Sequence, residues 1–242
     1  VDLLEDEEIW IRPKIAYSTR NDSTFKKINK NKFTPEIKNN LEINGFRFQL
    51  DFAYPTKPKQ IIFEGPNNIS QTISENNIEK EDPGIWGCGS NQINSLPPTG
   101  NYSIIIEFDN QNSIKYTFSM GEKAQNSLIY IIPSVVINDK NNIEKITWQT
   151  LKPDGTKVGD PGNIFNFIDS IQINAPSKEI ADQYGDISGG AERIYNTSHI
   201  KPEDNQHIME SKVSWKDVAN IDMAYEDIYG NDFLISFERN IE

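Results

Sequence analysis

The stretch from Thr99 to Met120, TGNYSIIIEFDNQNSIKYTFSM, constrains the fold more than any other part of the chain. Apolar side chains alternate with polar ones from Tyr102 to Phe108, and again from Ile114 to Met120. This period of two is typical of β-strands that bury one face. An Asn-rich turn separates the two arms, so the stretch predicts an antiparallel hairpin with a structural role.

The length of the loop decides how the two arms of this hairpin match. Residues opposite each other on paired strands point to the same side of the sheet, so only an odd-numbered loop aligns the two apolar rows. The expected pairs are Ile106 with Tyr116 and Ile104 with Phe118, with a loop at 110–112 or 109–113.

Further segments repeat the alternation between loops rich in Asn, Pro and Lys. The predicted strands are 7–17, 41–52, 59–65, 69–74, 128–137, 143–151 and 164–174. A second hairpin pairs 221–225 with 233–237, although a helix that begins at a Ser214–Asp217 capping box is the alternative. Otherwise only 177–184 predicts a helix.

Strands at intervals of roughly 8–12 residues, with few helices between them, are typical of antiparallel β-sandwiches. The length of 242 residues exceeds that of one typical domain. Both halves of the chain end in a hairpin, so we expect an all-β fold of two tandem β-sandwiches with little helix. The predicted domains are residues 1–121 and 122–242, joined at the polar stretch GEKAQN.

The segment Tyr130–Val158 resembles the middle of a bacterial immunoglobulin-like or fibronectin-type module. Its apolar strand ends in Pro133, the next strand contains a tryptophan expected to be buried, Trp148, and a Pro-Asp-Gly turn follows. The stretches PTGNYSIIIEF and YEDIYGNDFLISF resemble the last two strands of such modules, but the paired cysteines of antibody domains are missing. The resemblance implies a spacer, adhesion or ligand-binding module on an exported protein.

Charge and apolar runs limit the partners of the chain. A formal net charge of −12 argues against binding to a nucleic-acid backbone, which needs a basic surface. No apolar run approaches the roughly 20 residues that span a bilayer, so we expect no transmembrane segment. The chain starts at Val1, and a removed signal or lipoprotein leader would place it outside the cell or in the cell envelope.

Catalysis has one candidate nucleophile, Cys88 in IWGCGSNQ. An exposed thiolate there would need His199 or His207 as its base. The ordinary interpretation is a small cysteine in a tight glycine turn, packed under Trp86. A carboxylate pair that the pattern does not single out is the other catalytic alternative. We expect no enzyme.

Metal binding has two weak candidates. His199, Glu203, Asp204 and His207 could form a site, but their spacing matches no zinc motif. The loops FDNQNS, INDKNN and KPDGTKVGDPGN supply oxygen ligands of the kind calcium prefers. Turn formation explains these residues without a metal, so we expect no metal or cofactor, with calcium as the alternative.

Tryptophans are the remaining candidates for ligand contact. Trp148 lies in an apolar strand and is expected in the core, whereas Trp86 and Trp215 lie near turns and could stack on sugar rings. The expected function is a non-catalytic binding, adhesion or structural module that meets a protein or a glycan at the cell surface. A carbohydrate-binding module of a glycan-processing system is the main alternative, and a hydrolase the third.

Overall fold

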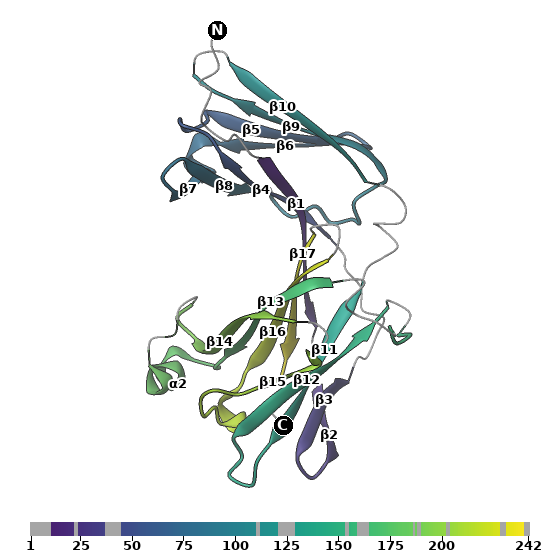
Figure 1. The fold of residues 1–242 in the computed structure, drawn as a ribbon, viewed down its shortest axis with the longest axis vertical. Helices are drawn as coiled ribbons and strands as arrows, with labels where there is room; N and C mark the ends of the chain where they lie inside the picture. Colours follow the sequence, from purple (N-terminus) through teal and green to yellow (C-terminus); the bar gives the residue numbers. More distant parts are fainter. Residues whose placement is uncertain are drawn as a thin grey trace. The chain divides into compact units, whose positions relative to one another are not determined.

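The computed structural model describes residues 11–21, 24–36, 45–109, 112–120, 129–152, 155–158, 165–185, 187, 190–201, 204–227 and 231–239. Antiparallel strands dominate these residues (Figure 1). The predicted all-β sandwich fold with little helix is confirmed. None of the described helices is long and apolar enough to cross a bilayer.

The chain folds into two compact units. Unit 1 comprises Val1–Ala16 and Asn44–Asn126, and unit 2 comprises Tyr17–Ile43 and Ser127–Glu242. Strand β1 (Ile11–Asn21) contributes residues to both units, so residues 17–43 group with the C-terminal half of the chain. The expected boundary between residues 121 and 122 lies outside the described residues, and the domain ranges drawn from the sequence stay a prediction.

Unit 1 contains two antiparallel sheets. The first has the order β1–β4–β8–β7, with β4 at Arg47–Ala53, β8 at Ile85–Gly89 and β7 at Glu79–Asp82. The second has the order β10–β9–β5–β6, with β10 at Ser113–Met120, β9 at Gly100–Glu107, β5 at Gln60–Gly65 and β6 at Ile69–Ser74. A 3₁₀ turn, η1 (Glu75–Asn77), precedes β7. The ring of Phe48 on β4 stacks on Phe63 of β5 at 4.9 Å, so the inner faces meet in an aromatic core.

The predicted hairpin is strands β9 and β10, but its expected register is wrong by two residues. Ile106 lies opposite Ile114, Ile104 opposite Tyr116 and Tyr102 opposite Phe118. The apolar rows still share one face, because the connection between Glu107 and Ser113 has an odd number of residues. The Phe108 N–H donates to the Asn112 carbonyl at 3.0 Å, which extends the ladder further toward the turn than expected.

Unit 2 also contains two antiparallel sheets. One has the order β14–β13–β16–β17–β1, with β14 at Arg193–Ile200, β13 at Phe165–Asn174, β16 at Asn220–Asp227 and β17 at Asp232–Glu238. The other has the order β15–β12–β11–β3–β2, with β15 at Gln206–Ile208, β12 at Ile143–Leu151, β11 at Tyr130–Ile137, β3 at Lys32–Glu36 and β2 at Thr24–Asn29. The hydroxyl of Tyr225 on β16 donates to the carbonyl of Ile129 at 2.6 Å and so connects the two sheets.

Two local predictions in unit 2 are confirmed. Strands β16 and β17 form the expected C-terminal hairpin, with Ile221 opposite Phe237, so the helical alternative is wrong. Its capping box forms one 3₁₀ turn, η5 (Trp215–Asp217). The predicted helix at 177–184 is α2 (Lys178–Ala181) followed by η3 (Asp182–Tyr184), capped by the Ser177 side chain.

Six strands lie outside the strands predicted from the sequence: β2, β3, β7, β8, β14 and β15. Strand β2 contains two lysines, β3 begins with one, and β7 consists of four charged, exposed residues. The expected glycine turn around Cys88 is strand β8. Gly87 leaves room for the Glu81 side chain above the strand, because a Cβ at residue 87 would lie 2.3 Å from Glu81 Oε1.

Candidate functional site

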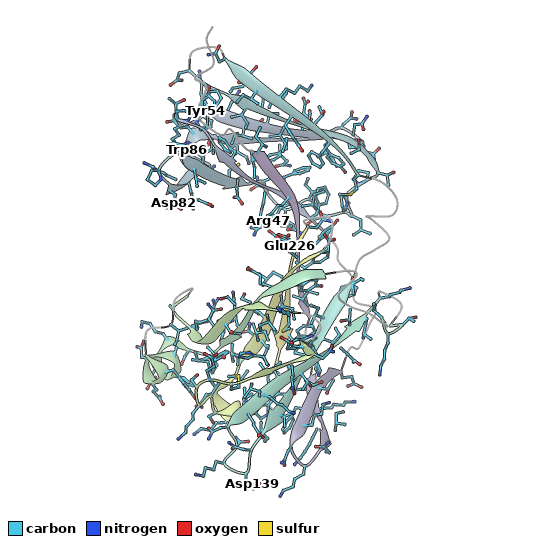
Figure 2. The ribbon with its side chains drawn as sticks, viewed as in Figure 1. Arg47, Tyr54, Asp82, Trp86, Asp139 and Glu226 are labelled. Atoms are coloured by element: carbon cyan, nitrogen blue, oxygen red, sulfur yellow. The ribbon has the colours of Figure 1, made fainter. Side chains whose placement is uncertain are left out.

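Trp86 is buried in unit 1, contrary to the expectation that it lies exposed near a turn. It sits on β8 opposite Phe52 of β4, with 9% of its surface exposed. Its indole N–H donates to the Tyr54 carbonyl at 2.9 Å, and the two residues are labelled close together in Figure 2. The inner face of a sheet that packs on a second sheet leaves no open side, so this ring offers no platform for a sugar.

Trp215 is buried in unit 2, with 4% of its surface exposed. Phe25 meets its ring edge-on at 5.3 Å, and Phe33 lies at the same distance from it. The Arg239 guanidinium lies 4.7 Å from the ring centroid and donates to the Trp215 carbonyl. The expected exposure of Trp215 is therefore wrong as well, whereas Trp148 is buried as predicted.

Cys88 lacks the features of an activated nucleophile. It lies opposite Leu50 within β8, and burial together with the negative charge of Asp51 raises the pKa of its thiol to about 12. A thiol with this pKa stays protonated at neutral pH, and the thiolate is the nucleophilic form. Cys88 belongs to unit 1, whereas His199 and His207 belong to unit 2.

The candidate histidine site finds no support in the described residues. His207 Nε2 on β15 lies 2.6 Å from the hydroxyl of Tyr195 on β14, so the imidazole is engaged by a residue of the other sheet of unit 2. Burial lowers the pKa of His207, against an opposing effect of Glu210. Glu203 lies outside the described residues, and among the described ones no three His, Cys, Asp or Glu side chains are placed to hold a metal.

Unit 1 instead shows a chain of aromatic rings that runs from its core to one sheet edge. Phe63 stacks on Phe48 at 4.9 Å, and Phe48 meets Tyr102 edge-on at 5.7 Å. Tyr102 stacks on Phe118 at 5.3 Å, and Phe118 lies 6.3 Å from Tyr116. The last two rings belong to β10, so the chain ends at the outer strand of the sheet (Figure 1).

The inward-facing residues of β10 are incompletely covered. Ile114, Tyr116 and Phe118, here called the apolar row, lie opposite three β9 residues that are at most 1% exposed. In the apolar row, Ile114 and Phe118 are only half-buried, and Tyr116 is 36% exposed. Within the described ranges no strand pairs with the outer edge of β10. This edge therefore combines unpaired backbone groups with accessible apolar side chains.

Other edge strands carry features that discourage pairing. Strand β7 has four charged residues, β15 has only three residues, and β2 presents Lys26 and Lys27. The exposed positions of β6 are serine and threonine, and the apolar residues of β14 with described side chains are buried. Strand β10 has eight residues and one charge, Lys115. Short length and charge, especially lysine, are the usual protections of an edge. Strand β6 has no charge but is shorter, and β14 equals β10 in length and has one arginine. Strand β10 differs from both in the exposed apolar side chains of its row.

The acidic edge at β7 has a different character. Burial raises the pKa of Glu81, and the nearby carboxylates of Asp51, Glu79 and Asp82 raise it further. Repulsion among these groups disfavours a second anionic strand beside β7, and their spacing does not form a metal site among the described residues. In unit 1 the outer strands β7 and β10 thus differ sharply in charge.

Comparison with known proteins assigns no family to the chain. No protein-family model matches the sequence, and no curated protein sequence matches it. Among solved structures, the chain is similar to Escherichia coli alpha-2-macroglobulin activated by porcine elastase, with 11% sequence identity and a TM-score of 0.24. The match covers 96% of this chain and 20% of that one, so the chain spans about a fifth of its length. A TM-score this low carries no structural or functional argument.

Proposed function

We propose that the chain is a non-catalytic binding or structural module of an exported or envelope-associated protein, built from immunoglobulin-like sandwiches. The binding element is the outer edge of β10, which accepts a strand from a protein partner. One observation carries the proposal: the apolar row stays partly exposed on a long edge strand that has a single charged residue.

Strand addition explains how such an edge would bind. Backbone hydrogen bonds to the added strand supply affinity, and its alternate side chains cover the apolar row and supply specificity. Tyr116 offers a large amphipathic ring at low entropic cost, as in many protein interfaces. The ring chain through Phe118 and Tyr102 fixes the row on a packed core, so little ordering is needed on binding.

A synthetic strand tests this proposal without knowledge of the natural partner. The probe is a capped octapeptide that alternates threonine and valine between terminal lysines. We expect the amides of Ser113–Met120 to exchange hydrogen more slowly in its presence, while those of β6, at the other edge of the same sheet, do not change. The same peptide with alternate N-methylated amides serves as the control, because it cannot complete the ladder.

Two results would contradict strand addition at β10. One is equal protection by the N-methylated peptide, which would indicate nonspecific apolar contact. The other is protection of β6 and not of β10, which would show that the opposite edge of the sheet accepts the strand. A Tyr116→Lys variant, which puts a charge in the apolar row, should abolish the protection while leaving the fold intact.

Glycan binding is a second candidate, favoured by the exposure of Tyr116. An aromatic ring on a sheet surface can stack on a sugar, and Tyr116 is more exposed than Trp86 or Trp215. A glycan array with and without calcium tests it. Binding that is lost in Tyr116→Ala and kept in Leu234→Ala, an exposed position in unit 2, would support a lectin-like role. Silence in both conditions would contradict it for the sugars tested.

A further inference from the structure

We propose that the partner strand at β10 is the β10 of a second copy of this chain, paired antiparallel about a twofold axis that passes through Tyr116. This inference rests on the proposed function, since it names the partner of the same edge. Twofold pairing joins two four-stranded sheets into one continuous sheet and uses the same surface on both copies.

Face matching limits which registers are open to the pair. Cross-strand neighbours point to the same side, so the apolar row must lie opposite apolar residues of the other copy. An axis that falls between two residues sets apolar positions opposite polar ones and is excluded. The axis must therefore pass through a residue of β10.

Charge selects among the remaining registers. An axis through Lys115 would place two ammonium groups directly opposite each other, which destabilises a strand pair. With the axis through Tyr116, Lys115 lies opposite Thr117, and Ile114 lies opposite Phe118. The two Tyr116 rings then cover each other. All apolar side chains that β10 leaves exposed are matched in this arrangement.

An axis through Thr117 is the nearest competitor. It would pair Tyr116 with Phe118 and Ile114 with Met120. Met120 is already buried in its own copy, with 7% of its surface exposed, so little apolar surface is gained there. The axis through Tyr116 buries the most exposed member of the apolar row against its own symmetry mate, and it is the register we infer.

Charge outside the edge opposes the dimer. Each copy carries a formal net charge of −12, and this repulsion is screened over about 8 Å at physiological ionic strength. Association should therefore be tighter in 300 mM than in 20 mM NaCl. Sedimentation velocity of the full chain over a concentration series measures this directly.

Disulfide trapping reads the register while leaving Tyr116 in place. Two single-cysteine proteins, Lys115→Cys and Thr117→Cys, are prepared in a Cys88→Ala background, with a mass tag on one of them. Opposite residues of an antiparallel pair have Cα atoms about 4.5–5.5 Å apart, within the range of a disulfide. We expect oxidation of the mixture to give the mixed dimer, and oxidation of either protein alone to give far less.

Each outcome decides the inference. A Thr117→Cys dimer that forms alone overturns the register, because it places the axis at Thr117. Monomers at every concentration and salt level overturn self-pairing, and the octapeptide experiment then shows separately whether β10 still accepts a strand.

Tyr116→Lys should abolish the dimer, and Thr72→Lys on β6, an exposed position at the opposite edge, should not. A dimer that survives Tyr116→Lys also overturns the inferred pairing of two β10 strands about Tyr116.

Discussion

The ring of Phe118 stacks on the ring of Tyr102 with centroids 5.3 Å apart and planes inclined by 14°. Tyr102 is 1% exposed, and its hydroxyl donates to the Pro98 carbonyl at 2.5 Å. The buried ring therefore fixes the position of the half-buried one, and through it the edge of β10. Changes at Tyr102 should affect both the stability of unit 1 and the order of that edge.

Replacement of Tyr102 separates the hydroxyl from the ring. Tyr102→Phe should lower the free energy of unfolding of unit 1 by about 1 kcal/mol, the usual contribution of one hydrogen bond. Tyr102→Ala should cost about 3–5 kcal/mol, because it also opens a cavity. Hydrogen exchange of the β9 amides measures both effects. Tyr116→Phe is the control and should change stability little; an equal loss there would contradict the role of Tyr102.

Gly65 permits the close approach of Tyr102 to the β5–β6 turn. A Cβ at residue 65 would lie 2.5 Å from Tyr102 Cε1, so Gly65→Ala should destabilise unit 1 by about 1–3 kcal/mol through overpacking. Gly89→Ala on β8 is the matched control, since its Cβ would meet nothing closer than the Phe48 carbonyl at 3.6 Å. Thermal unfolding compares the two variants. Equal melting temperatures would show that the Tyr102 ring can move aside.

Cys88 should react slowly with thiol reagents in the folded protein. With its pKa raised from 9.0 to about 12, the thiolate fraction at pH 8 falls about a thousandfold, and the rate with a disulfide reagent should fall with it. Denaturation in urea should restore the ordinary rate. A fast reaction in the native state would show that the thiol is activated and would revive the catalytic alternative.

The same group makes the stability of unit 1 depend on pH. The unfolded thiol loses its proton near pH 9 and the folded one near pH 12. Its contribution is therefore complete below pH 9 and is lost as the pH rises toward 12. Cys88→Ala should flatten this part of the stability profile, measured by urea unfolding at stepped pH. Tyr102, whose pKa is also raised to about 12, leaves a remaining slope above pH 10.

Arg239 holds Trp215 in unit 2 by two kinds of contact. Its guanidinium covers the indole at 4.7 Å and donates to the carbonyls of Trp215 and Val218. Arg239→Lys should lower the free energy of unfolding of unit 2 by about 1–2 kcal/mol, since an ammonium lacks the planar fork. Thermal unfolding tests this, with Lys216→Gln as the exposed control. An unchanged stability in Arg239→Lys would show that charge alone is sufficient.

The elements predicted correctly are those encoded by local alternation. Strands β9, β10, β16 and β17 each present apolar side chains at every second position, and a sheet with one buried face requires that period. The helix α2 follows its Ser177 cap in the same local way. These signals need no knowledge of the partners that cover them.

The elements missed are edge strands, a strand with glycines, and β3, an interior strand between β11 and β2. The lysines of β2 and the charges of β7 resemble those of loops, because an edge strand needs no buried row on its open side. The glycines of β8 resemble a turn, yet Gly87 lies in the ladder opposite Asp51. The burial of Trp86 and Trp215 depends on residues distant in sequence, such as Tyr54 and Phe33.

The sequence by itself determined the all-β class, the strand period and the parity of the β9–β10 loop, because these depend on neighbouring residues. The tertiary structure decided the register, the grouping of residues 17–43 with the C-terminal half and the burial of the candidate tryptophans. It also decided that Tyr116 lies on an edge. Register and edge position depend on which strands lie beside each other, and that follows from packing across the whole unit.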